Sequence, residues 1–284
     1  MKKIGFIDYY ISEWHANNYP SWIDEACERS GARYKLAYAW AELDKSPKYG
    51  ETTDEWCEKF GAEKCDTIEE LCEKSDVIVI LAPSDPETHL RYAEKALKYG
   101  KPTYIDKTFA PDLATAKQIF EIAKANGTPF FSSSALRYAE ELETPYDCLE
   151  IITTGGGSNL PEYIVHQAEI VVKKLGGGAE RIKAETYGSK TYLHVTYPDE
   201  RSAAMIYAPK LPFTVSMWGG EGTKNISGEI RSSYFVKLIE DMVGFFETQR
   251  FSFDGKETLE VMRLRQGAIR AYENQGEWID LPSM

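Results

Sequence analysis

The hydrophobic residues in the first half of the chain form short continuous runs separated by amphipathic stretches. The runs predict strands at residues 3–7, 34–39, 77–81, 102–105 and 129–132, and the stretches predict helices at residues 19–30, 67–74, 86–99 and 112–125. Apolar strands that alternate with helices are typical of a parallel sheet covered on both faces. We therefore predict a Rossmann-type doubly wound α/β fold for residues 1–138. Residues 41–61 predict a surface excursion with no element of its own.

The pattern changes after about residue 140. Strand-like runs occur at residues 148–153, 181–187, 192–197, 203–207, 213–218 and 278–281, and helical patterns occur at residues 161–175, 234–248 and 256–273. Runs of strands followed by helices are typical of an α+β arrangement with a mostly antiparallel sheet. We therefore predict a second domain of this kind over residues 139–284.

Composition limits the class of partner. The formal net charge of −12 disfavours nucleic acids and anionic membranes, because both are negatively charged, and leaves a small molecule as the expected partner. The five cysteines form no C-x-x-C pair, their number is odd, and no leader or long apolar span precedes the first strand. We therefore expect a reduced, cytoplasmic protein without a metal site.

The loop after the first strand departs from the pattern of dinucleotide-binding folds. Such folds place G-x-G-x-x-G there, whereas this chain has Asp8, Tyr10 and Glu13 at the three glycine positions. Two carboxylates would then oppose the attraction of a helix N-terminus for phosphate. The backbone N–H groups that remain for a pyrophosphate belong to Tyr9, Tyr10, Ile11 and Ser12.

Three further segments carry a resemblance to a known family. They are residues 82–89 (APSDPETH), residues 100–108 (GKPTYIDKT) and residues 161–166 (PEYIVH). With them the chain resembles the glucose-fructose oxidoreductase and inositol dehydrogenase family (Gfo/Idh/MocA) along nearly its whole length. The family pattern G-K-x-x-x-x-E-K-P keeps its lysine here, while aspartate replaces glutamate and threonine replaces proline. The resemblance implies a dinucleotide-binding domain at residues 1–138 and a substrate-binding and oligomerisation domain at residues 139–284.

The resemblance also implies catalytic residues, namely Lys107 and His166 with Glu162 in support. Glu162, His166 and Glu169 share one helical face, where a carboxylate orients an imidazole and tunes it as a general base. His166 would take the proton of a secondary hydroxyl while the Lys107 ammonium stabilises the developing alkoxide. The alternatives are a packed histidine with a local carboxylate partner and a solvated lysine after a strand.

Other candidate residues line the expected binding regions. For the cofactor, beyond the loop residues Asp8 to Ser12, we expect Glu42, Pro83, Ser84, His89 and Asp106. For the substrate we expect Arg137, Tyr138, Tyr163 and Glu169. Glu42 or Asp44 after the second strand would bind the adenosine ribose, and the absence of a nearby arginine favours NAD over NADP. The alternatives are a solvated acid at position 42, a helix-start histidine at position 89 and an interdomain ion pair for Arg137.

Three functions remain open on these residues. The first is an NAD(P)-dependent oxidoreductase acting on a sugar, polyol or related hydroxy compound. The second is a catalytically inactive relative that binds a sugar-like ligand without a cofactor, which the loss of all three glycines favours. The third is a lyase or hydrolase using the same polar cluster. An apolar face of the second sheet predicts a homodimer or higher homo-oligomer.

Overall fold

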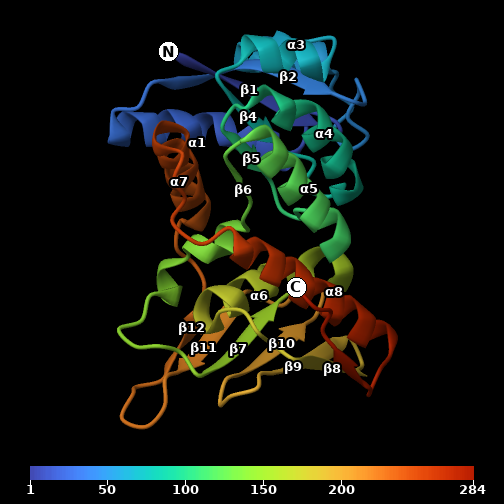
Figure 1. The fold of residues 1–284 in the computed structure, drawn as a ribbon, viewed down its shortest axis with the longest axis vertical. Coiled ribbons are helices and arrows are strands. Elements are labelled where there is room, and N and C mark those ends of the chain that lie inside the picture. The colour runs from blue at the N-terminus through green and yellow to red at the C-terminus, as the bar shows by residue number, and fades with distance from the viewer. The chain divides into compact units, whose positions relative to one another are not determined.

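The computed structural model describes all 284 residues, which form two compact units (Figure 1). The first unit contains Met1–Ser133 and Val236–Gly255, and the second contains Ser134–Phe235 and Lys256–Met284. The chain therefore returns to the first unit after most of the second has formed. The predicted domain boundary between residues 138 and 139 did not include this return of the chain to the first unit.

The first unit is built on a six-stranded parallel sheet with the order β3-β2-β1-β4-β5-β6. This order and the parallel pairing confirm the predicted Rossmann-type doubly wound fold. The strands are β1 (Lys2–Asp8), β2 (Tyr34–Ala41), β3 (Glu63–Lys64), β4 (Val77–Ile80), β5 (Thr103–Ile105) and β6 (Phe130–Phe131).

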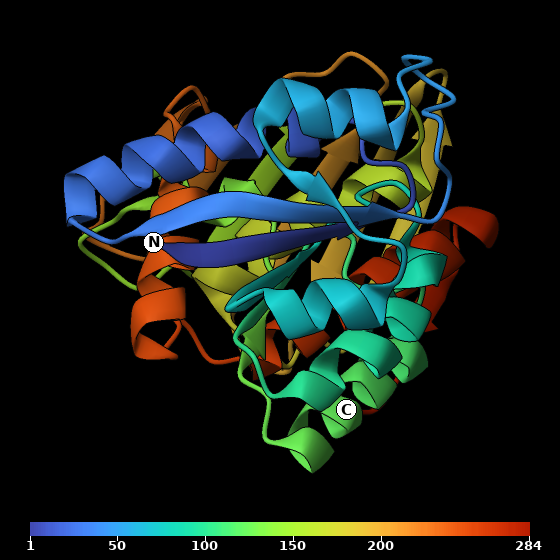
Figure 2. The ribbon, with the colours of Figure 1, turned by 90° about the horizontal axis from the view of Figure 1, so that it is seen from above.

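Helices cover both faces of this sheet (Figure 2). On one face lie α1 (Trp14–Ser30) and α2 (Thr53–Phe60), and on the other lie α3 (Ile68–Lys74), α4 (His89–Ala96) and α5 (Leu113–Asn126), with the short turns η1 (Pro86–Thr88) and η2 (Leu97–Tyr99). Gly5 in β1 makes the close packing of α3 possible, because a side chain there would collide with Leu71 and Ser75.

Two predictions for this unit were wrong. Helix α1 begins at Trp14 rather than at residue 19. The predicted start was too late because Pro20, which lies inside the helix, is a residue typical of a helix start. Residues 41–61 contain helix α2, which the sequence reading missed. Its signal is the capping box of Thr52 and Glu55, in which each side chain bonds the other residue's backbone N–H.

Helix α7 (Tyr234–Thr248) lies almost entirely in the first unit although its sequence follows the second sheet. The ring of Phe245 packs on Phe131, with 5.0 Å between the ring centroids, and Phe246 packs on Tyr34 at 5.7 Å. A further contact joins α7 to α1, where Arg29 pairs with Glu240 at 2.6 Å. Helix α7 is thus part of the core of the Rossmann unit.

The second unit holds a seven-stranded sheet with the order β12-β11-β7-β10-β9-β8-β13. Only β7 and β10 pair in parallel, so the predicted mostly antiparallel sheet is confirmed. The strands are β7 (Glu150–Gly155), β8 (Arg181–Tyr187), β9 (Lys190–Thr196), β10 (Ser202–Tyr207), β11 (Thr214–Trp218), β12 (Ile226–Glu229) and β13 (Trp278–Asp280). Strand β12 was not predicted.

Helices α6 (Leu160–Leu175) and α8 (Lys256–Glu273) pack on one face of this sheet and leave the other face uncovered (Figure 1). Their buried residues join those of the strands in one hydrophobic core. The turns η3 (Ala135–Tyr138) and η4 (Glu140–Leu142) precede the sheet. None of the helices combines the length and apolar character that a membrane span requires.

Candidate functional site

In the first unit the polar candidates gather at the carboxyl ends of β1, β4 and β5, the edge where α/β sheets bind ligands. Asp8 ends β1 and is only 1% exposed. Its Oδ1 accepts hydrogen bonds from the N–H groups of Tyr9 at 2.7 Å and Ala82 at 3.0 Å, whereas Oδ2 has no partner. Burial raises the pKa of Asp8 well above its usual range, and the nearby charge of Glu13 raises it further.

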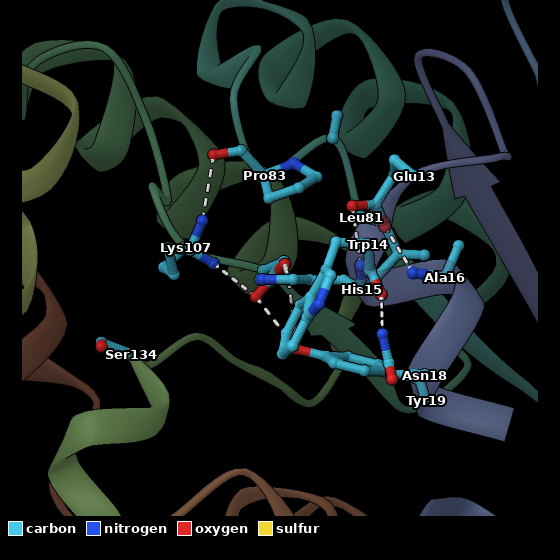
Figure 3. Close-up of polar contacts among 12 residues, drawn as sticks. Glu13, Trp14, His15, Ala16, Asn18, Tyr19, Leu81, Pro83, Lys107 and Ser134 are labelled. Carbon is cyan, nitrogen blue, oxygen red and sulfur yellow. Dashed lines mark hydrogen bonds and ion pairs between the residues drawn. The ribbon is translucent and has the colours of Figure 1, made fainter. Parts of the chain in front are cut away.

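The Glu13 side chain caps the N-terminus of α1 (Figure 3). Its carboxylate accepts from the backbone N–H groups of His15, at 2.7 Å, and Ala16. These are the orphan donors of the first helical turn, which in a dinucleotide-binding fold face the pyrophosphate. Burial raises the pKa of Glu13, while His15 and the two amides oppose this effect. The Glu13 side chain therefore occupies the N-terminus of α1, where a dinucleotide-binding fold binds phosphate.

Asp106, directly after β5, lies at the centre of a buried network. His15 pairs through Nδ1 with one oxygen of its carboxylate, and the hydroxyl of Tyr104 donates to the other at 2.9 Å. Burial opposes ionisation, but the charge and hydrogen bond of His15, with help from Lys107, lower the pKa of Asp106 to about 2. The Tyr19 hydroxyl lies 3.4 Å from both His15 Nδ1 and Asp106 Oδ1 and completes the network.

Lys107 follows Asp106, and its side chain points to Pro83 (Figure 3). Its Nζ donates to the carbonyl of Pro83 at 3.3 Å, and its backbone N–H donates to Asp106 at 2.9 Å. Ser84, next to Pro83, is exposed. His89 differs from these residues because it is fully buried and both its ring nitrogens face backbone carbonyls. His89 therefore ties β4 to the segment after β5 and offers no nitrogen to a ligand.

The adenosine side of the site contains an arginine that sequence reasoning missed. Oε2 of Glu42, directly after β2, accepts from Arg91 at 2.7 Å and from the Tyr92 hydroxyl at 2.7 Å. Despite its partial burial, these donors lower the pKa of Glu42. The premise that no arginine lies near this acid was wrong, because Arg91 comes from α4, far away in the sequence. The argument that favoured NAD over NADP therefore no longer applies.

In the second unit His166 is oriented by a serine. Its Nδ1 lies 2.7 Å from Oγ of Ser134, the residue that caps η3, and its ring contacts Tyr163 with 5.7 Å between ring centroids. Glu162 accepts from Ser158 at 2.6 Å and from Asn159 at 3.1 Å. Sequence reasoning gave the orienting role to Glu162 and missed Ser134, which no motif marks.

Arg137 and Glu169 form a buried ion pair in the second unit. Arg137 Nε donates to Glu169 at 2.5 Å, and Nη2 donates to Glu257 of α8 at 2.8 Å. Glu169 also accepts from the backbone N–H of Ser134 at 3.1 Å. These contacts join η3, α6 and α8, and they engage both residues in the framework around His166. Tyr138 is half-buried at the end of η3.

The strand-end residues fit a dinucleotide at the loop but not at the start of α1. The backbone N–H groups of Tyr10, Ile11 and Ser12 donate to no acceptor within the chain, although Ile11 and Ser12 are buried. The first turn of α1, in contrast, is taken by Glu13. The residues fit a pyrophosphate held on the loop amides, next to the unpartnered oxygen of Asp8. No group of histidine, cysteine or carboxylate side chains is arranged to hold a metal ion.

The fold and strand ends of the first unit define a Rossmann-type protein of the dinucleotide-binding class. Residues 27–133 match the Gfo/Idh/MocA family, described as "Oxidoreductase family, NAD-binding Rossmann fold". Over these residues, the match agrees with the resemblance that the sequence motifs indicated. Because that family consists of oxidoreductases, the match supports the prediction of an enzyme of the dehydrogenase class.

Individual proteins extend this comparison. The chain is 35% identical over 66 residues to the uncharacterized oxidoreductase YhhX of Escherichia coli, an alignment that spans 22% of this chain and only 19% of YhhX. It shares its fold with scyllo-inositol dehydrogenase from Lactobacillus casei, solved with NAD(H) and scyllo-inositol, at 13% identity, 99% coverage of both chains and a TM-score of 0.79. UDP-N-acetylglucosamine 3-dehydrogenase from Acidithiobacillus ferrooxidans is similar at 13% identity, with 95% of this chain and 97% of that chain covered and a TM-score of 0.75.

Proposed function

We propose that the protein is an NAD(P)-dependent oxidoreductase that acts on a secondary hydroxyl of a sugar, a cyclic polyol or a related small molecule. The observation that carries this proposal is the buried Asp106, paired with His15, next to Lys107 at the carboxyl end of β5. The similarity to dehydrogenases of inositol and of a nucleotide sugar supports the substrate class. We propose the cytoplasm as its location.

Lys107 and His166 are proposed to serve the same reaction. When bound, the nicotinamide supplies the acceptor for a hydride from the alcohol carbon. His166, fixed through Nδ1 by Ser134, takes the hydroxyl proton, and the Lys107 ammonium stabilises the charge that develops on oxygen. Glu162 supports the first turn of α6, one turn before the His166 imidazole.

Titration of the protein with NADH and NADPH, followed by cofactor fluorescence, tests the proposal first. Turnover is then measured on a panel of inositols and sugars. Lys107→Ala and His166→Ala should each lower kcat at least a hundredfold, and the double variant should be little worse than either, because the two groups act in one step. Lys98→Ala, at an exposed lysine of the same unit, is the matched control. Full turnover by Lys107→Ala contradicts the assignment.

A second candidate function is a sugar-binding relative without catalysis. Glu13 favours it, because its carboxylate takes the N–H groups that a cofactor uses in related folds. Absence of NADH and NADPH binding at millimolar concentration, together with binding of an inositol or sugar, would select this function over the first.

The uncovered face of the second sheet supports a homo-oligomer. It carries Ile152, 49% exposed, and Trp218, 37% exposed, beside a shallow hollow that also includes Ser216. Exposed apolar side chains on an uncovered sheet face are a candidate contact for a second copy of the chain. Light scattering after size-exclusion chromatography should give a dimer or larger assembly, and Ile152→Glu should shift it toward the monomer. A monomeric wild-type protein contradicts the proposal.

A further inference from the structure

Asp8 combines deep burial with an unused hydrogen-bonding atom. Oδ1 accepts hydrogen bonds from two backbone N–H groups, whereas Oδ2 has no partner. The residue is only 1% exposed. An ionised carboxylate in this state loses the hydration of Oδ2 without compensation, whereas a neutral carboxyl carries an O–H that needs an acceptor. The geometry therefore favours a protonated Asp8 beside a ligand that accepts a hydrogen bond.

The structure holds Asp8 in place at a conformational cost. Ala82, whose N–H donates to Asp8, has a left-handed φ of 59°, a conformation that residues other than glycine rarely adopt. Asp8 thus joins the end of β1 to the segment after β4 through its Oδ1. A neutral amide at position 8 would keep this link, because its carbonyl oxygen accepts the same two hydrogen bonds.

The charges around Asp8 do not neutralise it. Glu13 faces it from the start of α1, and the charge of Asp106 after β5 acts on it in the same direction. His15 pairs with Asp106, and the Lys107 ammonium donates to the carbonyl of Pro83, so neither pairs with Asp8. Tyr10 in the loop and Asp85 after β4 are further titratable groups of this edge. Glu51, which accepts a hydrogen bond from the Ser12 hydroxyl at 2.6 Å, adds another carboxylate beside the loop. A second acid and a pyrophosphate would therefore repel an ionised Asp8 from two sides.

We propose that Asp8 binds the cofactor as a neutral acid, donating the hydrogen on Oδ2 to a pyrophosphate oxygen held by the loop amides of Tyr10, Ile11 and Ser12. This inference rests on the proposed function and adds a role for the residue that replaces the first glycine of the fingerprint. The charged form of Asp8 excludes the pyrophosphate, and the neutral form binds it. Cofactor binding is consequently coupled to the protonation of one carboxyl group.

This coupling is measurable without turnover. The Kd of NADH is followed by fluorescence from pH 6 to pH 9, and proton uptake is measured by calorimetry in two buffers of different ionisation enthalpy. In the wild type the Kd should rise by up to tenfold per pH unit above the pKa of Asp8, and binding should take up as much as one proton. Asp8→Asn, a neutral donor of the same shape, should bind NADH independently of pH and at least tenfold more tightly than the wild type at pH 9.

Control variants separate the possible outcomes. Glu58→Gln removes an exposed acid of the same unit and should behave as the wild type. Asp8→Asn leaves His15, Asp106 and Lys107 unchanged, so a pH dependence that survives in this variant belongs to those groups and overturns the inference. Equal, pH-independent affinity of the wild type and Asp8→Asn also overturns it but leaves the proposed function intact. Absence of binding to both proteins at every pH removes the proposed function and the inference together.

Discussion

The buried pair of Asp106 and His15 makes a quantitative prediction about stability. Asp106 is fully buried and its pKa falls from the ordinary value of 3.8 to about 2. At about 1.36 kcal/mol for each pH unit, this difference corresponds to about 2 kcal/mol of folding free energy. Asp106→Asn keeps an oxygen for Tyr104 and the Lys107 amide but removes the charge. We therefore expect the variant to lose about 2 kcal/mol at pH 7.

The lowered pKa of Asp106 determines how the loss of stability depends on pH. Because the pKa is lowered in the folded state, the contribution is present above pH 3.8 and is lost as the pH falls through about 2. Urea unfolding, followed by tryptophan fluorescence at pH 7, 5, 4 and 3, should show the difference between the two proteins shrinking toward pH 3. Asp66→Asn, at an exposed acid, is the control and should change little. A loss below about 0.5 kcal/mol at pH 7, or one that does not shrink with acid, would refute the reasoning.

Two other substitutions test the packing that positions the site. Gly5→Ala places a Cβ against Leu71 and Ser75 and should cost about 1–3 kcal/mol, seen as a lower Tm; an unchanged Tm would show that α3 yields freely. Glu169→Ala leaves the Arg137 guanidinium buried with one carboxylate partner fewer and should cost about 3 kcal/mol in urea unfolding. A cost below about 1 kcal/mol would place the stabilising partner of Arg137 elsewhere.

The sequence predicted the fold well wherever periodicity and turn residues agreed. Continuous apolar strands of the first unit need both faces buried, and the predicted helices at residues 234–248 and 256–273 have the bounds that the structure shows. The errors arose where a local signal conflicted with the pattern. Pro20 concealed the first turn of α1, and a polar composition concealed α2 despite its capping box at Thr52 and Glu55.

The candidate site was predictable only in part. Motifs locate Lys107 and Asp106 at a strand end, because strand ends follow from the order of the elements. They do not reveal that Arg91 meets Glu42 or that Ser134 meets His166, since both contacts join residues more than 30 positions apart. The capping of α1 by Glu13 was also not predicted, because a glutamate at that position indicates only a negative charge.

The return of α7 to the Rossmann unit has a practical consequence for the design of truncated fragments. A fragment that stops at residue 133 lacks Phe245 and Phe246 and leaves the rings of Phe131 and Tyr34 without their cover. Such a fragment is expected to fold poorly and to aggregate. A soluble nucleotide-binding half would need residues 236–255 joined back to the first 133 by an artificial linker.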